Sequence, residues 1–325
     1  MKLGITSTIP SEIILAAGHS LLDLNNAFVA SGDPRTLVHH AHEQGFPATC
    51  CGWIKGMYSA VRELVQVDGI VAVTGGDCSN TLALAQTFES EGVKIYSFSY
   101  PAERDAKLLR DEMARFAELL GTDLVEAQKV RKMLRPVREG LQKLDNALAE
   151  GRLSFADYHE IALDSSDFGG DVEKYSTRVF ELVERSERAQ PRTDGVPIAL
   201  LGVPPIITDL PELFEKFGLR VVLDEIPRQF TMPHWQGSLE QQYLAYSYPY
   251  GMNFRVQDIG RQCAKRGVKA VVHYTQTFCF RAIEDIVLRR ELELPILTVE
   301  GDEPRAADAR LRLRLESYSE MLHGV

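Results

Sequence analysis

Short apolar runs alternate with helix-patterned segments in two separate parts of this chain. In the first part the apolar runs are residues 3–6, 21–24, 69–74 and 93–100. In the second part they are residues 196–202, 219–225, 268–274 and 295–301. Compact, β-branched runs of this length are typical of buried parallel strands, and strand–helix alternation builds a parallel sheet covered by helices. We therefore predict an α/β fold with two parallel-sheet units of the Rossmann/flavodoxin-like kind.

A helical region separates the two parts. From about residue 103 to 189 the apolar residues fall at helical spacing among many Glu, Lys, Arg and Ala residues, with Pro136 at a kink or a helix junction. A linker-like composition follows at 190–195. We divide the chain into an N-terminal α/β unit (1–102), a helical region (103–190) and a C-terminal α/β unit (191–325).

Composition excludes several classes of protein. The 325 residues include 46 acidic and 36 basic ones, so the formal net charge of −10 argues against a nucleic-acid partner. No apolar run reaches the length of a membrane span, and the first residues lack the pattern of a secretory signal. Five cysteines are too few, and odd in number, for a disulfide scaffold. We expect a cytoplasmic protein with reduced thiols, with neither a membrane nor a nucleic-acid partner.

Three of the cysteine positions coincide with the ends of predicted strands or the starts of predicted helices. Cys78 and Cys279 each follow a buried strand and precede a helix, and the Cys50–Cys51 pair precedes another helix. Ligands of open α/β sheets collect at the carboxyl ends of strands, and a helix N-terminus favours a thiolate. Cys263 lies inside a helical pattern and is expected to be a core thiol.

The residue pattern alone leaves the role of these cysteines open. No CxxC pair occurs, so their spacing gives a weak metal signal, and all five could be small buried side chains. A cysteine nucleophile would need a base, for which His273 is the nearest candidate in sequence. His39, His40 and His42 fit an exposed helix face better than a metal cluster.

Specific stretches in both α/β parts resemble one known family. They are GITSTIPSEIILAAGHSLLDLNN (4–26), FPATCCGWIKGMYSAV (46–61), VAVTGGDCSNTLAL (71–84), DEIPRQFTMP (224–233), YSYPYGM (246–252) and VVHYTQTFCFRAIEDIVLRRELELPILTVEGDEP (271–304). In combination they resemble the 2-hydroxyacyl-CoA dehydratase D-component family, which is related to benzoyl-CoA reductase subunits. The chain is most similar to the short single-chain members, some of which carry a double-cubane iron–sulfur cluster.

The resemblance implies an iron–sulfur cofactor held by Cys51, Cys78 and Cys279. The family cysteine of the first motif stands two residues before the tryptophan, which selects Cys51 over Cys50. Three thiolates leave one iron of a 4Fe–4S cubane without a protein ligand. A double-cubane 8Fe–9S cluster needs six thiolates, so it would require three from each chain of a homodimer. The sequence does not distinguish the two cluster types.

Most residues near these cysteines have two interpretations. We expect side-chain donors to the sulfurs at Ser79, Asn80, Thr275 and Gln276. The alternative for Ser79, Asn80 and Thr275 is that they simply cap helices and turns. Lys55 and Arg281 either balance cluster charge or lie on the surface. Trp53, Tyr274 and Phe278 either wall the cavity or pack in the core, and residues 202–205 end a strand at the same cleft.

The resemblance further implies an enzyme that receives low-potential electrons from an ATP-hydrolysing iron–sulfur activator protein. We expect a homodimer that reduces a small molecule. The alternative is a subunit of a 2-hydroxyacyl-CoA dehydratase with one 4Fe–4S cubane, which would act by ketyl-radical dehydration. A non-catalytic electron-transfer partner is a third possibility, and it predicts a cluster near the surface without a substrate pocket. The sequence names neither the substrate nor any set of residues that selects CoA, and catalytic residues beyond the cluster ligands are not identified.

Overall fold

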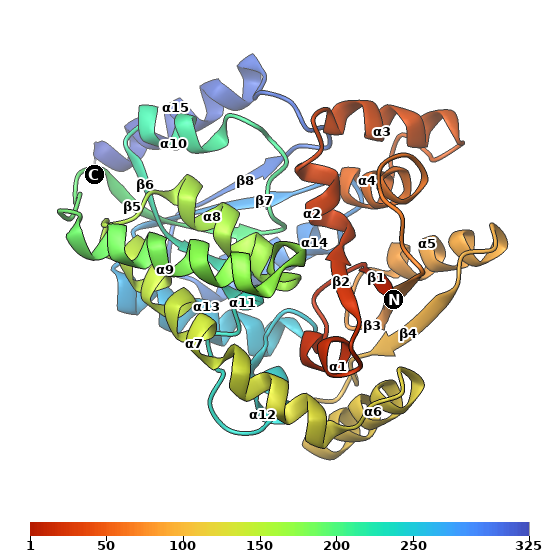
Figure 1. The fold of residues 1–325 in the computed structure, drawn as a ribbon. Helices are drawn as coiled ribbons and strands as arrows, with labels where there is room; N and C mark the ends of the chain where they lie inside the picture. The colour runs from red at the N-terminus through yellow and green to blue at the C-terminus, as the bar shows by residue number, and fades with distance from the viewer. Residues whose placement is uncertain (325) are drawn as a thin grey trace.

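The computed structural model describes residues 1–324 and contains two four-stranded sheets in which all strands are parallel (Figure 1). The first sheet consists of β1 (Lys2–Ile5), β2 (Ser20–Asp23), β3 (Gly69–Gly75) and β4 (Ile95–Ser99). The second consists of β5 (Val196–Gly202), β6 (Leu219–Asp224), β7 (Ala270–Thr275) and β8 (Ile296–Glu300). The orders are β2-β1-β3-β4 and β6-β5-β7-β8, so both sheets have the flavodoxin-like arrangement. The prediction of two parallel α/β units is confirmed.

The central strands of each sheet are buried on both faces, as expected for parallel strands covered by helices. All six residues of β7 are buried, and five of the seven in β3 are. The N-terminal helices are α1 (Ser11–Ala16), α2 (Leu24–Val29), α3 (Pro34–Glu43), α4 (Gly52–Ser59) and α5 (Ser79–Ser90). The C-terminal helices are α10 (Leu210–Lys216), α11 (Glu225–Phe230), α12 (Leu239–Ala245), α13 (Met252–Arg266), α14 (Phe280–Glu291) and α15 (Ala309–His323). Sequence reasoning missed the short helices α2, α11 and α12.

The central region is helical, as predicted. It forms α6 (Ala106–Leu119), α7 (Leu124–Ala149), α8 (Phe155–Leu163) and α9 (Val172–Arg188). Helix α6 packs into the core of the first sheet through Met113 and Phe116, whereas α7, α8 and α9 share a core of their own. Helix α7 also contacts α1 and β6, so it lies beside both sheets (Figure 1).

Pro136 does not divide α7. We expected a kink or a helix junction there, but one 26-residue helix runs through the proline. Proline removes one backbone N–H and normally disfavours the helix interior. Buried leucines on either side of it, including Leu134 and Leu141, hold both halves of the helix against the same core. This packing keeps the helix continuous.

Buried contacts join the two sheet units directly. Tyr243 lies on α12, a helix of the C-terminal α/β unit, but it packs into the core of the first sheet. Its hydroxyl donates a hydrogen bond to Glu12 on α1 at 2.8 Å. The amide of Gly52 donates to Gln276 Oε1 at 2.7 Å, and the indole of Trp53 donates to the carbonyl of Pro204 at 3.2 Å. The loops at the carboxyl ends of the two sheets are therefore in contact with each other.

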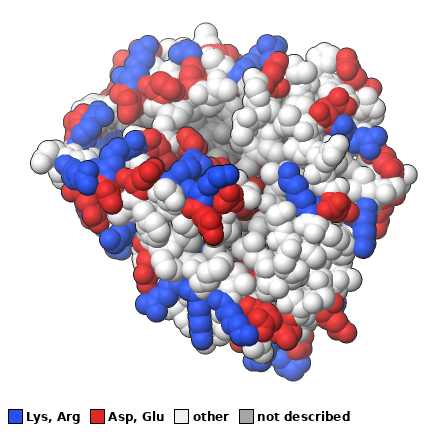
Figure 2. Space-filling view, viewed as in Figure 1, with Lys and Arg blue, Asp and Glu red and all other residues white. Residues whose placement is uncertain are grey.

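The surface carries both signs of charge. Figure 2 shows basic and acidic residues interspersed on one face, without an extended region of one sign. Within the described residues, no helix is both long and apolar enough to cross a bilayer. Several large apolar side chains are exposed along α14 and just before it, namely Phe278, Phe280, Ile283 and Ile286.

Candidate metal centre

Three of the five cysteines occupy the same structural position, immediately before the first residue of a helix. Cys51 is the N-cap residue of α4, Cys78 that of α5 and Cys279 that of α14. Each has the extended backbone expected of an N-cap, so the chain turns from a strand-end loop into a helix at the cysteine. The backbone N–H groups of each first turn therefore lie near a sulfur, and the Asn80 amide donates to Cys78 Sγ at 3.4 Å.

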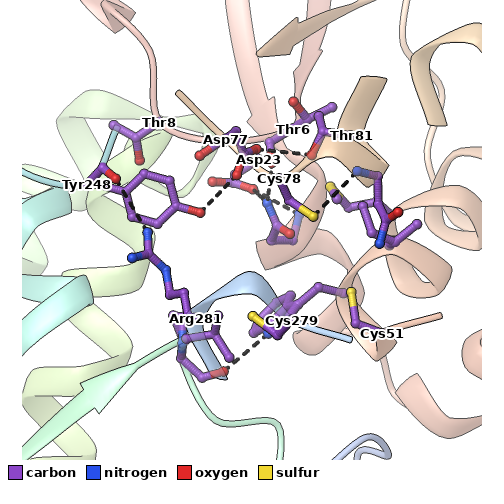
Figure 3. Close-up of a pocket in the computed structure, with 18 of the residues that line it drawn as sticks. Thr6, Thr8, Asp23, Cys51, Asp77, Cys78, Thr81, Tyr248, Cys279 and Arg281 are labelled. Carbon is purple, nitrogen blue, oxygen red and sulfur yellow. Dashed lines mark hydrogen bonds between the residues drawn. The ribbon is translucent and has the colours of Figure 1, made fainter. Parts of the chain in front are cut away.

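These three cysteines line one pocket of about 100 Å³ (Figure 3). Residues from the loops after β1, β3, β5 and β7, the two central strands of each sheet, also line it: Thr6 to Thr8, Asp77, Val203, Pro204 and Phe278. In a flavodoxin-like sheet the strand order reverses between these central strands, and ligands bind there, beyond their carboxyl ends. The binding positions of both sheets thus open onto the same pocket.

The remaining two cysteines lie elsewhere. Cys263 is buried in the core between α13 and the second sheet, as expected. Cys50 is partly buried beside Cys51 but is absent from the pocket lining. The pocket therefore presents three thiols, and among the residues the structure describes no fourth cysteine reaches it.

The thiols are neutral without a bound metal. Burial raises the pKa of Cys78 to about 11 and also raises that of Cys279. A hydrogen bond with the Cys50 thiol, together with burial, raises the pKa of Cys51 well above its usual value. Binding of a metal ion reverses this preference, because thiolate is the form that coordinates.

The donor set fits an iron–sulfur cluster. Thiolates are soft ligands that select such clusters, and the three helix N-termini direct partial positive charge toward the space where an anionic cluster would lie. Over residues 1–324, no three His, Cys, Asp or Glu residues are grouped closely enough to hold a single metal ion. Three cysteines from three separate helix starts line one pocket, and this is a donor set that an iron–sulfur cluster can use.

Arg281 brings a buried positive charge to the pocket. Its side chain is fully buried, donates to Glu284 at 3.2 Å and packs over the Tyr248 ring, while its Nε has no partner. The Tyr248 hydroxyl donates in turn to Asp77 Oδ1 at 3.1 Å. Of the two interpretations of Arg281, the surface position is wrong.

The other predicted neighbours divide between pocket and scaffold. Lys55 is also buried, but its Nζ lies 3.3 Å from His42 Nε2 and from the carbonyl of Ala48, away from the pocket lining. Asn80, Trp53 and Phe278 line the pocket, whereas Ser79, Tyr274, Thr275 and Gln276 do not. Gln276 instead holds the first residue of α4 through Gly52.

The histidines do not contribute to the pocket. His273 is buried on β7 with Nδ1 2.9 Å from Asp285 Oδ1, outside the lining, so it is not placed as a base for Cys279. His39 is exposed and pairs with Glu43, while His40 contacts Ser59. Both histidines thus lie on α3, and these partners come from α3 and α4.

Sequence reasoning missed a polar wall of the pocket. Asp23, Asn25 and Asn26 come from the end of β2 and the start of α2, and all three line the pocket. Their position after a predicted strand was the available signal, because the carboxyl ends of parallel strands share one edge of the sheet.

A comparison with proteins of curated function finds no match to this chain. A family model does match it. The model of the 2-hydroxyglutaryl-CoA dehydratase D-component covers residues 6–322, which is nearly the whole chain and includes all three pocket cysteines. Members of this family are components of dehydratase-type enzymes, work with an activator component and are known for iron–sulfur clusters. With the two flavodoxin-like sheets and the shared thiol pocket, this match establishes that the chain belongs to the 2-hydroxyglutaryl-CoA dehydratase D-component family.

Proposed function

We propose that Cys51, Cys78 and Cys279 hold an iron–sulfur cluster, and that the protein uses it to reduce a small molecule with electrons from an ATP-hydrolysing iron–sulfur activator. The observation that carries the proposal is the convergence of three N-cap cysteines on one pocket between two sheets. Bound there, the cluster would supply an electron of low potential.

The chain's own residues have definable tasks in this scheme. The three thiolates bind the iron, and the helix starts after them offset the negative charge. Arg281 lines the pocket as a buried guanidinium paired with Glu284, and its N–H groups are donors for an anionic group. The apolar side chains of Trp53, Ile54 and Met57 line the same space and limit the access of water.

The alternative function, a 2-hydroxyacyl-CoA dehydratase subunit with one 4Fe–4S cubane, is supported by the family match. A simple electron carrier is less consistent with a pocket that combines thiols, amides and carboxyl groups.

We further propose a homodimer with a double-cubane cluster, to which each chain contributes three thiolates. The second copy would cover the apolar face of α14, where Phe278, Ile283 and Ile286 have exposed fractions of 79%, 70% and 61%. Phe278 directly precedes Cys279, so this face is continuous with the proposed cluster site. Exposed apolar surface next to a binding site is typical of an interface.

The function is tested by turnover under anaerobic conditions. The holoprotein is combined with an ATP-hydrolysing iron–sulfur donor and offered either small reducible molecules or 2-hydroxyacyl-CoA thioesters. We expect ATP-dependent reduction of a small molecule and no dehydration of the thioester. Dehydration would support the alternative, and the absence of both reactions in a fully loaded protein would support the electron carrier.

A further inference from the structure

Two aspartates with buried carboxyl groups, from distant parts of the chain, are joined beside the pocket by a hydrogen bond from the backbone amide of one to the carboxyl group of the other. Asp23 ends β2 and lines the pocket with only 4% of its surface exposed (Figure 3). Asp167 lies between α8 and α9 and is 2% exposed. The backbone amide of Asp23 donates to Asp167 Oδ2 at 2.7 Å. Only Asp23 reaches the pocket, and Asp167 lies behind it.

Neutral donors hold both carboxyl groups in place. The amide and the side chain of Asn25 both donate to Asp23 Oδ1, at 2.8 Å and 2.9 Å. Asp167 Oδ1 accepts from the Asn26 side chain at 3.2 Å and from the Gly169 amide at 3.0 Å. These bonds fix the positions of the carboxyl groups without neutralising a charge.

No cation compensates the pair within the described residues. The nearest charged groups on the packed elements are engaged elsewhere: Arg178 of α9 pairs with Asp164 and Glu160. Arg138 of α7 donates to the carbonyl of Phe230 and packs over the Phe168 ring.

The remaining neighbours make the surroundings no more positive. Asp164 adds a negative charge near Asp167, and the buried hydroxyl of Tyr175 donates to the carbonyl of Ile161. On the pocket side, Asp77 is partly buried and adds no positive charge, and Arg281 pairs with Glu284. Two carboxylates would thus be buried together without a partner of opposite charge.

Such a pair retains a proton, because two desolvated negative charges side by side are costly. Burial, and then the negative charge of Asp23, raise the pKa of Asp167 to about 7. Burial also raises the pKa of Asp23. Because the negative charge of Asp23 acts on Asp167, we assign the proton to the pair and not to one residue.

We propose that the buried pair Asp23 and Asp167 retains one proton at neutral pH and that Asp23, the member that lines the pocket, donates it to the substrate atom that is reduced there. Asp167 is a positioning residue, since it acts through Asp23. The inference rests on the proposed function, whose iron–sulfur activator supplies the electron. The carboxyl O–H bond breaks, the reduced atom of the substrate gains the proton, and the carboxylate regains one from solvent.

Infrared spectroscopy of the metal-free protein tests the proton pair without any turnover. The C=O band of a protonated carboxyl group is followed as the pH is raised. In the wild type we expect a band that disappears as the pH rises through about 7. In Asp167→Asn the band should be absent above pH 6. In Asp23→Asn it should disappear at a lower pH than in the wild type. Asparagine can still cap α2, which favours retention of the fold, and circular dichroism checks it. Asp111→Asn, on the exposed face of α6, is the matched control.

A wild-type protein without a protonated carboxyl band above pH 6 would overturn the proposal. A band that persists unchanged in both variants would do so as well, because it would belong to another acid.

Turnover tests the donor role of Asp23. General acids typically contribute roughly 10²–10⁴-fold to a rate. We expect Asp23→Asn to lower kcat about 100-fold with KM little changed, and to remove the fall in rate that the wild type shows above neutral pH. Unchanged kcat in Asp23→Asn would contradict the donor role even if the band is present.

Failure of the proposed function gives a different pattern. A wild-type holoprotein without any ATP-dependent reduction would remove both the proposed function and the donor role, while a band near pH 7 would still establish the proton pair. Normal reduction without the band would leave the proposed function intact and remove only the pair.

Discussion

At the scale of single residues, position in the fold separates the five cysteines. Three are N-cap residues at one pocket, one is a neighbour outside the lining and one is a core thiol. Sequence motifs predicted this division, because Cys51, Cys78 and Cys279 each stand at a loop-to-helix boundary. The Asp23–Asp167 contact could not be predicted, since it joins residues 144 positions apart through tertiary packing.

The raised pKa of Asp167 predicts that its carboxyl group destabilises the fold as the pH rises. Between its ordinary value of 3.8 and about 7, the folded state binds more protons than the unfolded state, so the free energy of unfolding falls through this window. Asp167→Asn removes this loss and should be more stable than the wild type at pH 8, by on the order of 2 kcal/mol.

Urea denaturation of the wild type and Asp167→Asn at pH 5 and pH 8 measures this difference. The advantage of the variant should grow from pH 5 to pH 8. A difference that is the same at both pH values would contradict a pKa of about 7 for Asp167 in the folded state.

At the scale of helices, close packing of α2 against α4 positions the helix that begins at Cys51. A Cβ atom on Gly56 would lie 2.3 Å from Cγ of Phe28, whose ring on α2 is fully buried. Gly56 therefore allows the two helices to approach, and α4 carries the first cysteine into the pocket. Such contacts are sensitive to a single added methyl group.

We expect Gly56→Ala to lower the free energy of unfolding by about 1–3 kcal/mol, because the added methyl group overpacks the contact with Phe28. The matched control is Gly260→Ala, inside α13, where the nearest atom to a new Cβ is 3.8 Å away. Alanine should stabilise that helix by about 0.5–1 kcal/mol. Equal effects in the two variants, measured by urea denaturation, would contradict the packing argument.

Apolar periodicity predicted the long helices and the strands well, but short elements escaped it. Helices α2 and α11 have six residues each, too few for a periodic pattern to be distinct from a loop. The helix junction considered at Pro136 is wrong because propensity is local, whereas the continuity of α7 depends on tertiary packing. Local sequence thus determined the type of the long elements and not the continuity of every helix.

At the scale of the whole molecule, function depends on how the two sheets face each other. Strand patterns predicted two sheets, and the equivalent positions of Cys78 and Cys279 after their strands led us to expect one cleft between the two units. That arrangement rests on contacts such as Gly52 with Gln276 and Trp53 with Pro204, whose partners are 224 and 151 positions apart. The proposed division into residues 1–102, 103–190 and 191–325 places these contacts between its outer segments.

The proposed dimer predicts a change in mass when the apolar face of α14 receives a charge. We expect Ile283→Asp to convert a particle of two chains into single chains, since burying an unpaired carboxylate opposes association. Leu313→Asp on α15, where the side chain is 63% exposed, should leave the mass unchanged. Light scattering measures both; a monomeric wild type, or a dimer insensitive to Ile283→Asp, would contradict this interface.

The central claim is that three cysteines hold an iron–sulfur cluster, and anaerobic iron and sulfide analysis of five single cysteine variants tests it most directly. The wild type should bind about four irons per chain, with extra sulfide if two cubanes are bridged. Alanine at Cys51, Cys78 or Cys279 should remove most of this iron, while alanine at Cys50 or Cys263 should leave it in place. Iron that is retained without Cys51 but lost without Cys50 or Cys263, or a wild type that binds no iron, would contradict the account.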